Sequence, residues 1–154
     1  MRIISLPVNS LSYTTPLRIM VVDDEEDVCT VMKWGLQQAG FDVEAFSQPI
    51  TALDHFKPYK YDFVLIDIKM PDMDGFRFYG RIKDIQYDVK VCFMTAALDS
   101  DEEFITKHLP GNNKRVCVAK KPIRIQELVL LLSAQMDNAY INKLDKHMPN
   151  SRQE

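Results

Sequence analysis

The sequence is poor in the residues that build disulfide frameworks and soft metal sites. It holds three cysteines, Cys29, Cys92 and Cys117, and no two of them are close enough to form a CxxC pair. An odd number of widely spaced cysteines indicates neither a disulfide framework nor a zinc knuckle. The three histidines are scattered and show no ligand spacing. We therefore interpret the cysteines as small core residues of a protein in a reducing compartment.

A strong positive charge and long apolar runs are also lacking. The formal net charge is −3 and the sequence pI is about 5.6, without a local basic patch, so we expect no direct binding to nucleic acid. No stretch is apolar enough to span a membrane. Residues 1–16 interleave apolar residues with polar residues and proline, unlike a signal peptide. These absences predict a cytoplasmic protein without membrane insertion.

What the sequence does contain is a hydrophobic content of 46%, enough for one domain core in 154 residues. Five segments are typical of strands: the apolar segments Leu17 to Val22, Phe63 to Asp67, Val89 to Met94 and Val116 to Ala119, and the alternating segment Phe41 to Phe46. Helical patterns follow each of them: from the acidic run Glu25 to Asp27 up to Gly40, Pro49 to Lys57 with Ser47 as a candidate cap, Phe76 to Ile85, Asp101 to Leu109, and Ile123 to about Leu144. This alternation predicts a doubly wound α/β domain with a parallel sheet.

Polar residues stand where four of the predicted strands end. They are Asp23 and Asp24, Asp67, Thr95, and Lys121. Because the carboxyl ends of parallel strands lie at one edge of a sheet, we expect these side chains to meet there. Ordinary alternatives exist, since an aspartate at a strand end is often a turn residue and an acidic run is often a solvated helix start.

Three carboxylates at one edge would repel one another unless a cation lies among them. Oxygen ligands without His or Cys favour a hard ion, and Mg²⁺ is the best candidate because it leaves room for a phosphoryl oxygen. Lys121 and the Thr95 hydroxyl would then stabilise the charge of a transferring phosphoryl group. Asp67 is the natural nucleophile, since a carboxylate can form an aspartyl phosphate. The pattern therefore indicates phosphoryl-transfer chemistry.

Four motifs together resemble the receiver domain of two-component response regulators. They are VVDDEED at Val21 to Asp27, LIDIKMPDMDG at Leu65 to Gly75, MTA at Met94 to Ala96, and KKP at Lys120 to Pro122. Their order and their positions at strand ends also agree with that family, over roughly Leu17 to Asn138. The resemblance implies a flavodoxin-like, five-stranded parallel sheet of order 2-1-3-4-5 with five helices.

The resemblance also implies a role for each motif residue. Asp67 is expected to be the phosphoacceptor, Asp23 and Asp24 to bind Mg²⁺ together with Asp67 and the Lys69 backbone carbonyl, Thr95 to be the hydroxyl switch residue, Lys121 to be the family's lysine, Ala96 to keep the site open, and Pro122 to follow a cis peptide bond.

The same resemblance implies partners. We expect a sensor histidine kinase or a phosphotransfer protein upstream, and a downstream target or a second copy docked on the fourth helix, fifth strand and fifth helix. The chain would be a switch that phosphorylates and dephosphorylates itself, and not a turnover enzyme acting on external substrates. We expect residues 1–16 to form a flexible extension, 17–138 a receiver domain of the stand-alone type, and 139–154 a helical extension and tail.

Several features depart from the family. Val118 stands where members usually have Tyr or Phe, and the loop Leu109 to Arg115 is a few residues longer than usual. The last helix is apolar on all sides around Leu130, which fits either tight packing or an interaction face. The departures at Val118 and in the loop Leu109 to Arg115 leave one alternative open, a receiver-like module that signals by protein contacts without phosphorylation, although such a module would not need the clustered acids.

A second alternative is a phosphatase or phosphotransferase of the haloacid-dehalogenase kind, which also uses an aspartate nucleophile after a strand. That kind of enzyme requires a second Asp two residues later as a general acid. Here the position is Lys69, which argues strongly against it.

Overall fold

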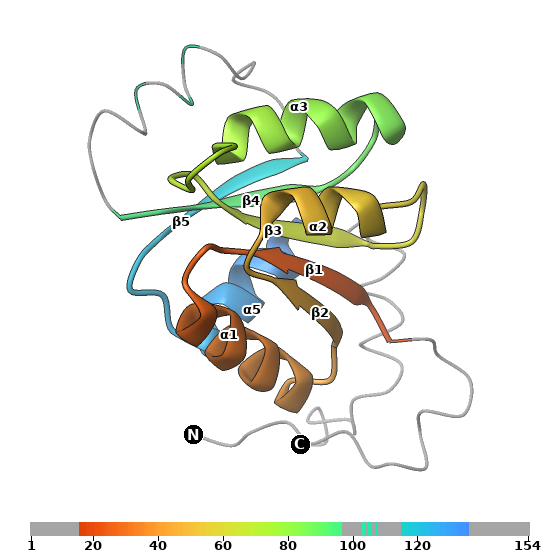
Figure 1. Ribbon diagram of the computed structural model, residues 1–154. Coiled ribbons are helices and arrows are strands. Elements are labelled where there is room, and N and C mark those ends of the chain that lie inside the picture. Colours follow the sequence, from red (N-terminus) through yellow and green to blue (C-terminus); the bar gives the residue numbers. More distant parts are fainter. Residues whose placement is uncertain (1–15, 97–102, 104, 106, 108–114, 136–154) are drawn as a thin grey trace, which may run out of the picture.

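In the part of the chain that the structure describes, five parallel strands form one sheet in the order β2-β1-β3-β4-β5 (Figure 1). The computed structural model describes residues 16–96, 103, 105, 107 and 115–135. The strands are β1 (Arg18–Val22), β2 (Asp42–Phe46), β3 (Phe63–Asp67), β4 (Val91–Thr95) and β5 (Val116–Lys120). The predicted doubly wound α/β fold and its strand order are confirmed.

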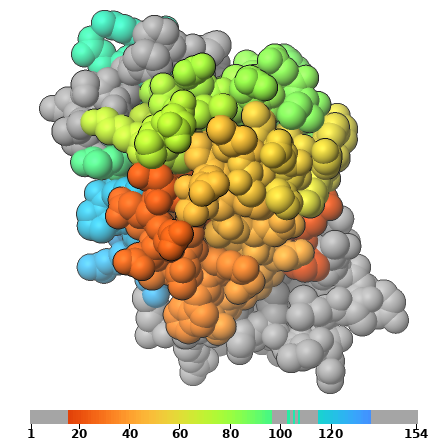
Figure 2. Space-filling model, in the orientation of Figure 1, coloured from red at the N-terminus to blue at the C-terminus, as the bar shows by residue number. Residues whose placement is uncertain are grey.

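Helices pack on both faces of this sheet. Helices α1 (Glu26–Gln38) and α5 (Ile125–Ala134) contact each other and lie on one face, whereas α2 (Pro49–His55) and α3 (Gly75–Ile85) contact each other and lie on the opposite face. Seen from the side shown in Figure 2, residues of α1, α2 and α3 form adjoining parts of the surface. The central strands are therefore covered from both sides.

The predicted fourth helix, Asp101 to Leu109, lies largely outside the described residues. Glu103, Ile105 and Lys107 are described, and each is helical. The loop expected to be longer than usual, from Leu109 onward, also lies outside the described residues up to Arg115.

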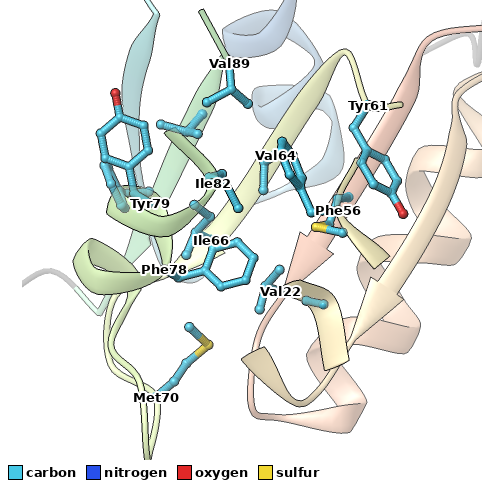
Figure 3. Packing of buried hydrophobic residues seen from close by; sticks show 14 of the residues in the cluster. Val22, Phe56, Tyr61, Val64, Ile66, Met70, Phe78, Tyr79, Ile82 and Val89 are labelled. Carbon is cyan, nitrogen blue, oxygen red and sulfur yellow. The ribbon is translucent and has the colours of Figure 1, made fainter. Parts of the chain in front are cut away.

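The apolar runs of the strands follow from burial on both faces. In β1, Met20 and Val22 belong to the hydrophobic cluster beneath α2 and α3, whereas Ile19 and Val21 belong to the cluster beneath α1 and α5. Figure 3 shows Phe78 of α3 beside Val22 in the first of these clusters. A strand that is buried on both faces has no solvent side and therefore needs apolar residues at every position.

The last helix is shorter than predicted. Helix α5 begins at Ile125 and ends at Ala134, so the prediction of a continuous helix from Ile123 to about Leu144 is wrong. The amide of Gln135 donates to the carbonyl oxygen of Leu132 at 3.1 Å, a three-residue bond that tightens the final turn. Leu132 is also the last fully buried side chain of the helix, so the packing that stabilises it ends there.

Two local predictions at helix ends have different outcomes. Gly40 follows α1 with a φ of 100°, the left-handed conformation expected of a glycine that stops a helix. Helix α2 begins at Pro49 as its first residue, so the capping position is Gln48 and the prediction of Ser47 as the cap is wrong.

None of the helices in the described part of the chain has both the length and the apolar character to cross a bilayer. Residues 1–15 and 136–154 lie outside the described residues. The predicted extension, tail and domain limit at residue 138 therefore stay predictions.

Candidate functional site

Three carboxylates meet at the carboxyl edge of the sheet. Asp23 and Asp24 follow β1 directly, and Asp67 is the last residue of the neighbouring strand β3. One carboxylate oxygen of each residue lies within 4.8 Å of the others. Asp23 and Asp67 are buried, with 0% and 6% of their surface exposed. Adjacent parallel strands therefore bring together acids that are more than forty residues apart in the sequence, as predicted.

Every polar atom of Asp23 forms a hydrogen bond. Its Oδ1 accepts from the Glu25 amide at 2.9 Å, and its Oδ2 accepts from Lys121 Nζ at 2.7 Å. Its own amide donates to the Phe46 carbonyl at 3.1 Å, and its carbonyl oxygen accepts from the Cys29 thiol at 3.1 Å. The carboxylate thus has one orientation, fixed by α1, β2 and the segment after β5.

Lys121 brings the positive charge of the site. Its amide donates to the Thr95 carbonyl at 2.7 Å, and its Nζ lies 2.7 Å from Asp23 Oδ2 and 3.4 Å from Asp67 Oδ1. Burial lowers the pKa of Lys121, but its hydrogen bond to Asp23 and the charge of Asp67 outweigh burial and raise that pKa overall. Lys121 is therefore charged across the physiological range. The peptide bond to Pro122 is cis, as the resemblance implied.

The surroundings of Asp67 disfavour its ionised form. Burial, and after it the charge of Asp23, raises the pKa of Asp67 to about 7, although the nearby Lys121 opposes this shift. Near neutral pH, ionising this carboxylate therefore costs free energy in the protein without a bound cation. A divalent cation among the three acids would remove that cost.

The loop after β3 is pressed against the start of α3. The Gly75 amide donates to the Ile68 carbonyl at 2.8 Å, and a Cβ at Gly75 would lie 2.5 Å from the Asp67 carbonyl oxygen. Within this loop Lys69 is exposed and stands between the buried residues Ile68 and Met70. Lys69 thus lies two residues after Asp67 in a loop whose neighbouring residues are packed, and metal binding by its carbonyl stays a prediction.

The remaining predicted site residues lie at the end of β4. Thr95 is the last residue of this strand and is 1% exposed, whereas Ala96 follows it and is exposed. Thr95 pairs in register with Lys120 of β5, and Lys121 is the next residue along the chain. The three acids, Lys121 and the end of β4 therefore lie at this one edge, and the roles predicted for these residues stay predictions.

Sequence reasoning missed two supporting features. One is the close approach of Gly75 to the Asp67 backbone, and the other is the thiol of Cys29 beneath Asp23. Cys29 lies on the same face of α1 as Met32 and Leu36, and that spacing would have predicted its burial. Its bond to the Asp23 carbonyl carries no sequence signal.

The donor set fits Mg²⁺. All three ligand atoms are carboxylate oxygens, without a thiolate or imidazole in the group, and Asp24 is not buried, so that water can complete the coordination. A five-stranded parallel sheet of this order, with clustered acids and a lysine at its carboxyl edge, defines a flavodoxin-like α/β protein with an acidic group at that edge that could hold a cation.

The sequence comparison identifies the family. The family model of the response regulator receiver domain matches residues 19–133, and this chain belongs to that family. Members belong to two-component systems, in which magnesium and an aspartyl phosphate are standard. The transcriptional regulatory protein TrcR of Mycobacterium tuberculosis is 30% identical over 118 residues, which are 77% of this chain and 44% of TrcR.

Two further similarities differ in coverage. The response regulator receiver protein CpdR of Brucella abortus is 29% identical over 116 residues, or 73% of this chain and 90% of CpdR. The structure of Vibrio cholerae CheY4 covers 79% of this chain and all of its own with a TM-score of 0.68 at 20% identity, which supports the fold alone. The chain spans less than half the length of several curated relatives, such as 44% of TrcR and 20% of ARR10 of Arabidopsis thaliana.

Proposed function

We propose that this receiver domain takes a phosphoryl group on Asp67 in a Mg²⁺-dependent reaction and passes the signal on through a change of its interaction surface. The observation that carries the proposal is the position of the Asp67 carboxylate, which shares one pocket with Asp23 and Asp24 and lies 3.4 Å from the Lys121 ammonium group. A carboxylate between a cation site and a lysine is suited to attack phosphorus.

In the proposed reaction one Asp67 oxygen attacks the phosphorus of the donor in line with the leaving group. The new bond joins that oxygen to phosphorus, and the bond from phosphorus to the leaving group breaks. With acetyl phosphate the products are the aspartyl phosphate and acetate. Water later hydrolyses the aspartyl phosphate to the carboxylate and inorganic phosphate, so the chain acts as a switch and not as a turnover enzyme.

The surrounding residues have separate tasks in this reaction. Asp23, Asp24, Asp67 and the Lys69 carbonyl would hold Mg²⁺, which when bound would neutralise negative charge at the site. Lys121 Nζ pairs with one phosphoryl oxygen and the Thr95 hydroxyl donates to another. Ala96 leaves space for the group. Lys121 is already held at this pocket by Asp23, which reduces the reorganisation that the reaction requires.

The proposed signal leaves through the surface of the fourth helix, β5 and α5. A phosphoryl group adds charge at the carboxyl edge, and Thr95 would move toward it. Leu130 of α5 is 72% exposed, a large apolar side chain suited to contact with a partner or with a second copy. A sensor histidine kinase or a phosphotransfer protein is the proposed phosphoryl donor, and the cytoplasm is the proposed location of this chain.

A phosphorylation-independent interaction module is the second candidate, and Val118 favours it. This residue is half-buried on β5 in register with Phe93, where the family usually has an aromatic side chain. Without the aromatic ring, coupling from Thr95 to the outer surface must use other side chains.

Intact-protein mass spectrometry separates the two candidates. The chain is incubated with acetyl phosphate with and without Mg²⁺, as wild type, Asp67→Ala and Asp54→Ala, the last being an exposed acid on α2. We expect one phosphoryl adduct in wild type and Asp54→Ala, dependent on Mg²⁺, and none in Asp67→Ala. If wild type gains no adduct and also fails to bind beryllofluoride, the phosphorylation proposal is refuted and the interaction module is favoured.

A further inference from the structure

The thiol of Cys29 contacts two backbone carbonyl oxygens beside the three acids. Cys29 Sγ lies 3.1 Å from the Asp23 carbonyl oxygen and 3.4 Å from the Phe46 carbonyl oxygen. Its backbone amide donates to the Glu25 carbonyl at 3.1 Å, the bond that closes the first turn of α1. One residue therefore joins the start of α1 to the ends of β1 and β2.

The other two buried cysteines differ from Cys29. Cys92 and Cys117 belong to the hydrophobic cluster beneath α1 and α5, where they pack against apolar side chains. Cys29 is buried but belongs to neither of the two clusters found among the described residues. Its surroundings are the polar backbone groups at the acidic edge.

The bond to Asp23 completes the set of contacts that fixes this residue. The amide and both carboxylate oxygens of Asp23 are bonded to Phe46, Glu25 and Lys121, and the thiol satisfies the remaining carbonyl oxygen. Asp23 is fully buried, so water does not replace a lost donor without rearrangement. Without the thiol, the Asp23 carbonyl oxygen would lose this donor. The backbone that carries the Asp23 side chain would then be less restrained.

We propose that Cys29 is a positioning residue for the divalent cation: its protonated thiol, donating to the Asp23 carbonyl, holds the Asp23 carboxylate in the orientation that meets Asp24 and Asp67. The inference rests on the proposed function, because it assumes that these acids bind a cation. Residues behind metal ligands commonly tune affinity in this way.

The test is a Mg²⁺ titration of the full chain followed by two-dimensional ¹H–¹⁵N NMR. The amide of Glu25 reports directly, because it donates to Asp23 Oδ1. The variants are Cys29→Ala, which removes the donor, Cys29→Ser, which keeps one, and Cys92→Ala, a matched loss of a buried thiol away from the acids. Cys29→Val fills the space without a donor and replaces Cys29→Ala if that variant does not fold.

We expect the Mg²⁺ dissociation constant to rise about fivefold in Cys29→Ala or Cys29→Val, below the usual effect of about 10- to 100-fold for a residue behind a ligand, because a thiol is a weak donor. Cys29→Ser should stay within about twofold of wild type, since a hydroxyl also donates. The Glu25 amide shift in Mg²⁺-free protein should move in the donor-less variants and return in Cys29→Ser.

A purely structural role gives a different result. Cys29→Ala would then be less stable but would bind Mg²⁺ as wild type does, or Cys29→Ser would lose affinity as Cys29→Ala does, and either outcome overturns the inference. A wild type that binds Mg²⁺ but gains no phosphoryl group refutes the proposed function alone, and the titration still decides the role of Cys29. A wild type that binds no Mg²⁺ overturns both.

Discussion

Replacing Asp67 by asparagine should stabilise the Mg²⁺-free protein. The substitution keeps the shape of the side chain and removes one of three clustered negative charges. Asp67 is 6% exposed, and burial together with the charge of Asp23 raises its pKa from 3.8 to about 7. A buried carboxylate with a raised pKa weakens the folded state wherever it must ionise.

The size of the effect follows from that pKa. A difference of one pH unit between folded and unfolded pKa values corresponds to about 1.4 kcal/mol, so the rise from 3.8 to about 7 corresponds to at most about 4 kcal/mol. Partial access of water through the neighbouring Asp24 reduces this, and we expect about 2–4 kcal/mol.

The pH dependence has a definite sign. Below about pH 4 Asp67 is protonated in both states, so wild type and Asp67→Asn should be equally stable. Between pH 4 and 7 the folded protein holds a proton that the unfolded chain has lost, so wild type loses stability as the pH rises. Above about pH 7 the advantage of Asp67→Asn should be constant.

Urea unfolding, followed by far-UV circular dichroism in the presence of a chelator, measures this difference across the pH range. Asp54→Asn is the control, because its carboxylate is exposed, and it should change stability by less than about 0.5 kcal/mol. Excess Mg²⁺ should reduce or reverse the advantage, since only wild type keeps the full ligand set. An advantage that is absent at about pH 8, or equal at all pH values, would refute the electrostatic reasoning.

Three other substitutions test the backbone packing beneath the site, the contact between α1 and α5, and the charge of the site. Gly75→Ala should weaken Mg²⁺ binding and phosphorylation, because its Cβ would lie 2.5 Å from the backbone beneath the site, whereas Gly80→Ala in the same helix meets open space and should stabilise by about 0.5–1 kcal/mol in urea unfolding. Gly35→Ala should destabilise by about 1–3 kcal/mol, because its Cβ would lie 2.5 Å from Ile125 Cγ1 and 2.7 Å from Ile125 Cδ1. Ile125→Val, which lacks Cδ1, should partly relieve the loss. Lys121→Gln should slow phosphorylation by acetyl phosphate at saturating Mg²⁺, measured by intact mass, because no ammonium group then pairs with the phosphoryl oxygen. Unchanged rates in Lys121→Gln would contradict the role given to this lysine.

The strands were predictable because four of them are short apolar runs and β2 alternates polar with apolar residues. The observed bounds of β3, Phe63–Asp67, equal the predicted ones, and the other strands differ by one or two residues at their ends. The end of α5 was not predictable in this way. Apolar residues continue to recur beyond Ala134 in the sequence, so their spacing does not mark the final turn, which the bond from the Gln135 amide to the Leu132 carbonyl closes.

The sequence by itself determined which residues form the site. Each acid, the threonine and the lysine stand at the end of an apolar run, and parallel strands bring such ends to one edge whatever the details of packing. The ionisation of Asp67, the approach of Gly75 and the bond from Cys29 to Asp23 were decided only by the tertiary structure. These properties depend on distances of a few ångströms between segments far apart in the chain, and only the packed fold fixes such distances.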